Sequence, residues 1–197
     1  MSAGPRTVLV DADVFVRLAA IGAVDLLQTL PGDVWMPVPV DQEITSRPAA
    51  TVLESAIDAG WLHIAAPPAD RYVQHAARHL GRDVERVTYN GDIFLLAQAL
   101  AVPSVVVTDD APLRRCCRAL SIPVAGTVAI IVTAVERGPY TPLQATGQLF
   151  ALDEIGPRLG PPVRRAAEQL IAEAAGQKQL PDHAVTRPDG PASDDGR

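Results

Sequence analysis

Pairs of aspartates end two of the apolar runs in this sequence. The first run, VLV, is followed by Asp11 and then Asp13; the second, VVVT, is followed by Asp109 and Asp110. Burying a carboxylate without a partner costs several kcal/mol. Two pairs of acids at the ends of strands that otherwise belong in a core therefore indicate a use for the charge.

Two further acids stand at comparable positions in the chain. Glu43 lies on a short helix that we expect after the prolines of MPVPV, and Asp92 follows Gly91 at the start of an apolar helix. Carboxylates that converge at one place repel one another and raise each other's pKa unless a cation binds. Hard oxygen ligands suit Mg²⁺ or Mn²⁺, and such an ion would support hydrolysis of a phosphodiester.

Each acid also has a plainer explanation when it is taken alone. An aspartate after a strand or at a helix start often caps the helix or complements its dipole, and this applies to Asp11 or Asp13, to Asp92 and to the Asp109-Asp110 pair. Taken alone, Asp92 is better explained as a cap than as a ligand, and Glu43 as a solvated residue. A cap needs only one acid, so the pairs favour a shared site.

The elements that must position these acids alternate between apolar runs and helical patterns, which is typical of a parallel sheet covered by helices. We expect strands at 7–10, 33–36, 61–64, 104–107 and 122–124, and helices at 14–27, 50–59, 70–80, 92–101, 113–120, 127–137, 143–152 and 162–175. Ligands of an open parallel sheet bind outside the carboxyl ends of its strands. The acids follow strand ends, so the expected architecture places them where its active site would lie.

The order of these motifs resembles a known family. The run VLVDADVFVRLAAIGAVDLLQTLPGDVWMPVPVDQEI resembles the N-terminal half of PIN domains, most of all their toxin-type (VapC-like) subgroup. NGDIFLLAQALAVPSVVVTDDAPLRRCCRALSIPVAGTVAIIVTAVERG resembles the second half, and RLGPPVRRAAEQLI is similar to the terminal helix. The resemblance covers nearly all of residues 6–175 and lies in the order and spacing of the motifs.

This resemblance implies a PIN-like α/β fold, a three-layer sandwich in which helices flank a central, mostly parallel sheet. It also implies a ribonuclease site that depends on Mg²⁺ or Mn²⁺. The matching site positions are Asp11, Glu43, Asp92, Asp109 and Asp110, with Thr108 and Asp13 in supporting roles. The Thr-x-Asp spacing common to PIN domains favours Asp110 over Asp109 as the site acid.

The chain departs from the subgroup's pattern at two places. The subgroup often has Glu where Asp92 stands and a second Glu two positions on, where this chain has Phe94. The Gly-Arg that often follows the Asp-Asp pair is also missing. Because Asp is the commoner residue at position 92 in PIN domains generally, we expect the site to be retained.

Two other functions compete with the ribonuclease. A haloacid-dehalogenase-type phosphatase also begins with a strand and Asp-x-Asp, but it needs a lysine for the phosphoryl charge. The only lysine here is Lys178, and Glu43 and Asp92 would have no role. The second alternative is a catalytically silent PIN-like module that binds RNA or protein. The complete set of acids favours an RNA-cleaving enzyme, and the sequence leaves open a protein antitoxin and a homodimer.

Composition narrows the class of protein further. The net charge of −6 argues against a broad basic surface for nucleic acid. No apolar run approaches the roughly 20 residues of a membrane span, and the N-terminus lacks an apolar signal region, so we expect a cytoplasmic protein. Residues 1–176 are expected to form the nuclease domain and residues 177–197 a disordered tail.

The cysteines and histidines receive structural interpretations. Cys116 and Cys117 are adjacent in a helical segment and are expected to be packing residues. His75 and His79 are four residues apart on one helix, a spacing that suits a metal, but no third ligand of the right type is near in sequence. We therefore expect both histidines to be surface residues.

Overall fold

The computed structural model describes residues 7–83, 90–156 and 159–178. Its sheet has five parallel strands in the order β3-β2-β1-β4-β5. The strands are β1 (Thr7–Val10), β2 (Val34–Pro37), β3 (Leu62–Ala65), β4 (Ser104–Val107) and β5 (Val124–Ala125). The helices are α1 (Ala12–Ala20), the 3₁₀ helix η1 (Val24–Thr29), α2 (Val38–Gln42), α3 (Arg47–Asp58), α4 (Asp70–His79), α5 (Gly91–Ala101), α6 (Ala111–Ala119), α7 (Thr127–Arg137), α8 (Pro142–Ile155) and α9 (Pro161–Lys178).

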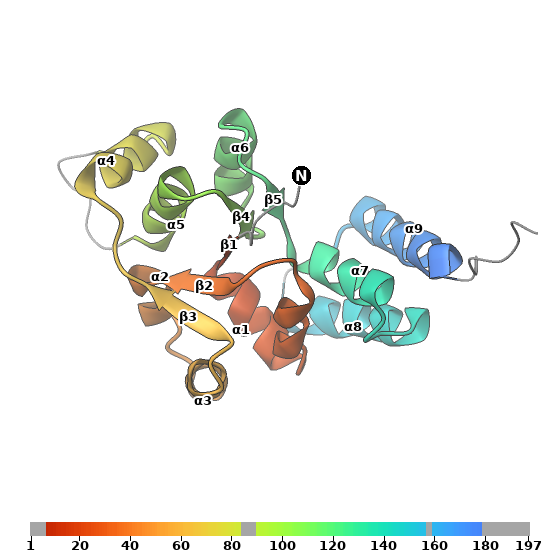
Figure 1. Cartoon of the computed structure of the whole chain (residues 1–197). Coiled ribbons are helices and arrows are strands. Elements are labelled where there is room, and N and C mark those ends of the chain that lie inside the picture. Colours follow the sequence, from red (N-terminus) through yellow and green to blue (C-terminus); the bar gives the residue numbers. More distant parts are fainter. Residues whose placement is uncertain (1–6, 84–89, 157–158, 179–197) are drawn as a thin grey trace, which may run out of the picture.

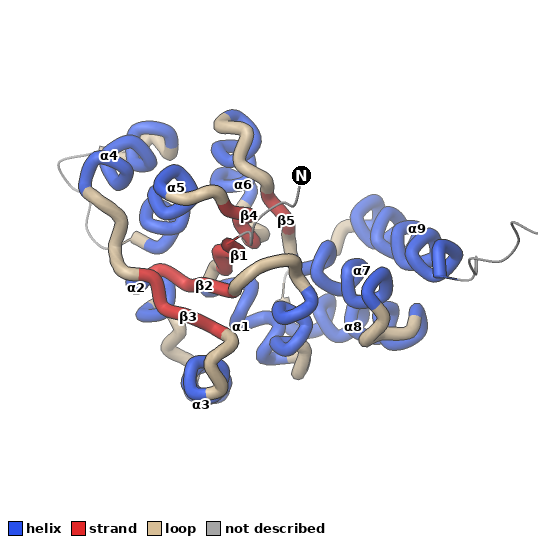
Figure 2. Tube along the Cα trace, in the orientation of Figure 1, coloured by secondary structure: helices blue, strands red, loops and turns tan. Residues whose placement is uncertain are grey.

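Helices cover both faces of this sheet. Figure 1 shows α4, α5 and α6 on one side of the strands and α1 and α3 on the other, while Figure 2 shows the strands between these helical layers. Helices α7, α8 and α9 pack on one another beyond β5. The structure therefore confirms the expected α/β architecture, with an entirely parallel sheet.

The central strands are formed by β-branched and aliphatic residues that the helices bury. Val8, Leu9 and Val10 are at most 1% exposed, as expected for a strand covered on both faces. Helix α5 packs on β1, β2 and β4, with Leu95 and Leu96 fully buried. This packing positions the strand ends, which carry Asp11 and the Asp109-Asp110 pair.

Register brings two of the acid-bearing segments together. Val10 of β1 pairs with Val107 of β4, so both strands end at the same level. The backbone N–H of Asp11 then donates to the carbonyl oxygen of Val107 at 3.0 Å. As a result, Asp11 and Thr108 lie side by side at the carboxyl edge although they are 97 residues apart in the chain.

The expected single helix over 14–27 is wrong. Helix α1 ends at Ala20, and Gly22 adopts a φ of +66°, the left-handed region that glycine reaches without a steric penalty. The chain then continues as η1, which keeps Val24 and Leu27 buried. The apolar positions were identified, but their common periodicity concealed the turn between the two helices.

Other boundaries agree closely with the expectations. Strands β1 and β4 and helix α7 have the expected limits, and α7 ends at Gly138 with a φ of +104°. Helix α9 continues to Lys178, two residues into the segment expected to be a tail. The rest of that segment, 179–197, lies outside the described residues, as does most of the polar connection before Asn90.

The cysteines are free, and Cys117 is fully buried, consistent with packing roles. Burial raises the pKa of the Cys117 thiol to about 11, so this sulfur stays protonated and unreactive at neutral pH. None of the helices that the structure describes is long and apolar enough to cross a membrane.

Candidate active site

Asp11 occupies the N-cap position of α1, but its side chain does not cap the helix. The carboxylate instead accepts a hydrogen bond from the hydroxyl of Thr108 at 2.5 Å. Asp11 is only 8% exposed, so its carboxylate is held in one orientation at the end of β1. The expected alternative, a helix cap, is therefore wrong for Asp11.

Thr108 connects Asp11 to the second acidic segment. Its oxygen also accepts from the backbone N–H of Asp110 at 3.1 Å, so one fully buried hydroxyl orders both acids. Asp110 is the N-cap of α6, and its carboxylate accepts from the N–H of Leu113 at 2.6 Å. Asp110 thus caps a helix and also stands beside the acids of the neighbouring strand.

Glu43 and Asp92 meet at the start of α5. Glu43 follows α2, and its Oε1 accepts from the backbone N–H of Gly91 at 2.8 Å. A Cβ on residue 91 would lie 2.6 Å from that oxygen, so a side chain there would displace the Glu43 carboxylate. Asn90 caps α5 by accepting from the N–H of Ile93, which leaves the carboxylate of Asp92 available; the cap interpretation of Asp92 is wrong.

The charges of these acids act on one another. The pKa of Asp11 is raised from 3.8 to about 6, first because the group is buried; the charges of Asp92, Asp13 and Glu43 raise it further, and the Thr108 hydrogen bond lowers it. Asp13 itself is exposed in the first turn of α1. A carboxyl group with a pKa this close to neutrality is characteristic of functional sites.

Asp92 responds to the same surroundings. Burial raises its pKa, the charges of Asp110 and Glu43 raise it further, and Arg82 lowers it. These couplings join five carboxylates at the carboxyl edge of the sheet: Asp11, Asp13, Glu43, Asp92 and Asp110. We call these five residues the acidic site.

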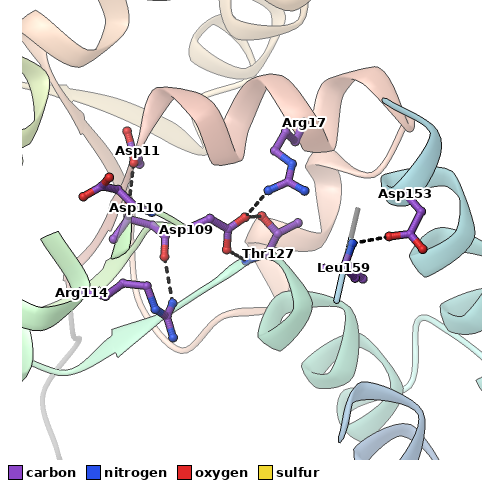
Figure 3. Close-up of polar contacts among 9 residues, drawn as sticks. Asp11, Arg17, Asp109, Asp110, Arg114, Thr127, Asp153 and Leu159 are labelled. Atoms are coloured by element: carbon purple, nitrogen blue, oxygen red, sulfur yellow. Dashed lines mark hydrogen bonds and ion pairs between the residues drawn. The ribbon is translucent and has the colours of Figure 1, made fainter. Parts of the chain in front are cut away.

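Asp109 lies outside the acidic site. Figure 3 shows its carboxylate directed toward Arg17 and Thr127, with Asp11 and Asp110 on its other side. One oxygen accepts from Arg17 Nη1 at 2.7 Å and from the Thr127 hydroxyl at 2.6 Å, while the other accepts from the Thr127 N–H at 3.0 Å. These contacts connect α1, the end of β4 and the start of α7.

Gly126 and Arg114 also lie against the Asp109 network. A Cβ on Gly126 would lie 2.5 Å from Asp109 Oδ1 and 2.8 Å from Arg114 Nη1, so a side chain there would displace these two groups. Arg114 donates to the carbonyl oxygen of Thr108 at 2.9 Å. A cavity of about 460 Å³ adjoins this network and is walled mainly by apolar residues of α7, α8 and α9. Asp109 therefore faces helices α7, α8 and α9 and not the acidic site.

A divalent cation suits the chemistry of the acidic site. In the ranges 7–83, 90–156 and 159–178, no three His, Cys, Asp or Glu side chains form a ready-made metal cage. Mg²⁺ does not require one, because it commonly binds through one or two carboxylates and keeps several waters for a phosphate. Burial and mutual repulsion disfavour the ionised acids, and a cation would relieve both costs.

The pKa of Asp11 predicts how stability depends on pH in EDTA. Because its folded-state pKa of about 6 exceeds the usual 3.8, ionisation disfavours the native state. We expect the free energy of unfolding to fall by up to about 3 kcal/mol between pH 4 and pH 7, most of it by about pH 6. Urea unfolding at several pH values measures this loss, and Asp11→Asn should flatten the profile. An identical slope in that variant would contradict the assignment.

The fold and the acidic edge together define an α/β protein with a carboxylate site at the ends of parallel strands. A family model described as a PIN domain (DUF3368) matches residues 7–173, and the chain belongs to that family.

Among solved structures, the chain is similar to one described as the crystal structure of VapBC2 from Rickettsia felis bound to a DNA fragment from their promoter. The identity is 13%, the match covers 61% of this chain and 98% of that chain, and the TM-score is 0.44. No curated protein sequence matches this chain.

Several residues that build the site have little signal in the sequence. Arg17 contacts Asp109 across 92 residues, and nothing in its local pattern indicates that contact. Arg82 precedes a segment without clear periodicity, and its charge reaches Asp92 only through the packing of α4 on α5. Gly91 and Gly126-Thr127 belong to the motifs that carry the PIN resemblance, so these positions could have been selected from the sequence.

Proposed function

We propose that this protein is a divalent-metal-dependent ribonuclease that hydrolyses RNA phosphodiester bonds. The observation that carries the proposal is the acidic site, where five carboxylates interact electrostatically at the carboxyl edge of the sheet. Membership of the PIN-domain family supports a nuclease-type role. The same membership leaves the haloacid-dehalogenase-type phosphatase without support.

In this proposal Asp11, Asp92 and Asp110 hold the cation, Mg²⁺ or Mn²⁺. The ion supplies a Lewis acid that neutralises charge on the phosphate and activates water. Thr108 keeps the Asp11 carboxylate in place, and the α6 cap keeps Asp110 in place. Glu43, anchored on the Gly91 N–H, retains a second oxygen that can accept a proton from the attacking water.

The direct test is cleavage of RNA by the purified protein. Structured and unstructured RNAs are incubated with Mn²⁺, with Mg²⁺ or with EDTA, and the products are separated on a denaturing gel. The proposal expects fragments with either metal and intact RNA in EDTA. Equal cleavage in EDTA and in metal would contradict a metal-dependent reaction.

Metal binding should also be visible without RNA. A ligand that binds only the native state raises its stability, so millimolar Mn²⁺ or Mg²⁺ should raise the melting temperature of the wild-type protein. Asp11→Asn removes a proposed ligand and should abolish most of that increase. Glu54→Gln, an exposed change on α3, is the matched control and should respond like the wild type. The same shift in Asp11→Asn and wild type would contradict a shared metal site.

We further propose that the protein is the toxin of a toxin–antitoxin pair, on the basis of its VapC-like sequence motifs. Induced expression should then arrest growth of a bacterial host, and Asp11→Asn should relieve the arrest. Co-expression of the protein encoded next to this one tests the antitoxin, and light scattering tests the homodimer. Growth unaffected by the active enzyme would contradict the toxin role but not the ribonuclease.

A further inference from the structure

Helix α4 carries a row of basic residues that the acidic site does not use. Arg71, His75 and Arg78 follow a four- and three-residue spacing that places them on one side of the helix, and Arg82 follows just after the helix end. All of these side chains are exposed, whereas Val73, Ala76 and Ala77 face the core. We call Arg71, His75, Arg78 and Arg82 the basic face.

The basic face leads directly to the acidic site. Helix α4 packs along α5, and Figure 1 shows the two helices side by side. Arg82 is close enough to Asp92, at the start of α5, to lower the pKa of that acid. The backbone N–H of Arg82 donates to the carbonyl oxygen of Ala77 at 2.8 Å. Gly81, with a φ of +64°, turns the chain back at the end of α4.

The other end of the basic face borders a hollow. A pocket of about 320 Å³ is lined by Arg71, Tyr72, His75 and Leu100, and Leu100 lies at the far end of α5 from Asp92. The guanidinium of Arg71 lies 4.8 Å from the centre of the Tyr72 ring. A hollow with a cation and an aromatic edge suits a nucleotide base, because base recognition by single-strand binders relies on aromatic and Arg side chains.

The charges of this surface are free to meet an anion. Within the described part of the chain, the side chains of Arg78 and Arg82 form no hydrogen bond or ion pair, and that of Arg71 bonds only the Tyr72 hydroxyl. The His75 ring contacts that of His79. Asp70 and Asp83 adjoin the two ends of the row. The chain has a net charge of −6, and the five carboxylates of the acidic site repel an RNA phosphate. A local basic surface would offset this repulsion and allow RNA to approach.

We propose that the basic face binds the phosphate backbone of single-stranded RNA and guides it to the acidic site. The inference rests on the proposed ribonuclease function. The eight residues of helical rise from Arg71 to His79 span about 12 Å, enough to accompany about three or four stacked nucleotides, and Arg82 follows the helix end. The backbone runs along α4, a base enters the hollow at Tyr72, and the scissile phosphate arrives at Asp92.

The test measures RNA binding without cleavage. A fluorescein-labelled 12-nucleotide oligo(U) RNA is titrated with the full chain in EDTA, and anisotropy is followed at several salt concentrations. Arg71→Ala/Arg78→Ala removes two charges from the basic face, and Arg137→Ala/Arg165→Ala removes two exposed charges from α7 and α9 as the matched control. Arg82 is kept so that the acidic site is unchanged. Melting curves verify that both variants are folded.

We expect the α4 variant to bind about tenfold more weakly, and the slope of log affinity against log salt to shrink by about 1.4, about 0.7 per lost phosphate contact. The control variant should bind like the wild type. Equal losses in both variants, or no loss in either, would overturn the inference, as would a loss confined to the matching oligo(dT) DNA.

The cleavage assay separates this inference from the proposed function. RNA that binds through α4 but stays intact with Mn²⁺ would overturn the ribonuclease and leave the basic face standing. RNA that is cleaved by the wild type, with binding unchanged in Arg71→Ala/Arg78→Ala, would overturn the basic face alone.

Discussion

Replacing Asp92 by Asn, or Glu43 by Gln, is expected to slow RNA cleavage by about a hundredfold or more. Even residues that only support a metal ligand typically cost 10- to 100-fold in activity, so a ligand or a residue that orients water should cost at least as much. Both changes are nearly isosteric. Gln can still accept from the Gly91 N–H, and Asn90 remains the cap of α5, so the fold should be preserved.

The measurement is the initial rate of RNA cleavage at saturating Mn²⁺, with melting curves for each variant. Glu54→Gln, which lies on α3 outside the acidic site, serves as the control and should keep the wild-type rate. Normal RNA cleavage in both site variants would contradict the roles proposed for Glu43 and Asp92. Turnover of a small phosphate monoester by both variants, without RNA cleavage by the wild type, would contradict the ribonuclease and return the phosphatase to consideration. In that mechanism Asp11 is the nucleophile, and neither Glu43 nor Asp92 takes part.

The sequence predicted the sheet well because its signals are local. The run before Asp11 and the run before Asp109 are dense in β-branched residues, and each is followed at once by a polar residue. The structure adds the strand order: β1 lies beside β4, and the pairing of Val10 with Val107 brings Asp11 beside Thr108. The carboxyl edge of the sheet was expected to carry Asp11, whereas the place of Asp109 was not predicted.

The uses of the individual acids could not be predicted in the same way. Asp11, Asp92 and Asp110 all stand at helix starts, and sequence statistics for such positions favour capping. The structure separates them: Asp110 caps, Asp11 does not, and Asn90 caps in place of Asp92. Which neighbour takes the hydrogen bond depends on backbone angles of a few residues, and residue type alone does not specify those angles.

The partner of Asp109 is the clearest case of information that only the tertiary structure contains. Arg17 and Thr127 approach it from α1 and α7, elements that are far apart in the sequence. The PIN resemblance placed Asp109 among the site positions as a candidate metal ligand, although the Thr-x-Asp spacing favoured Asp110 as the site acid. The observed contacts direct the Asp109 carboxylate away from the acidic site: Asp109 joins α1 to the start of α7.

These contacts predict opposite phenotypes for the two adjacent aspartates. Asp110→Asn should lower RNA cleavage by about a hundredfold or more, because it removes a charge from the acidic site. Its melting temperature should stay the same or rise, since Asn caps helices about as well as Asp and one repulsion with Asp92 disappears. Activity and stability should therefore separate at this residue.

Asp109→Asn should show the reverse. It weakens the ion pair with Arg17, whose side chain is 18% exposed against 30% for Asp109, and it disturbs the bonds to Thr127. Hydrogen bonds to charged groups contribute about 1.5–3 kcal/mol, so we expect a loss of about 2 kcal/mol and a melting temperature lower by about 5 °C. Cleavage below the new melting point should stay within about tenfold of the wild type, because the acidic site keeps all five carboxylates. Cleavage rates and melting curves of both variants test this assignment. An Asp109→Asn variant that is inactive but stable would show that Asp109 is the site acid and that the roles of the two aspartates are exchanged.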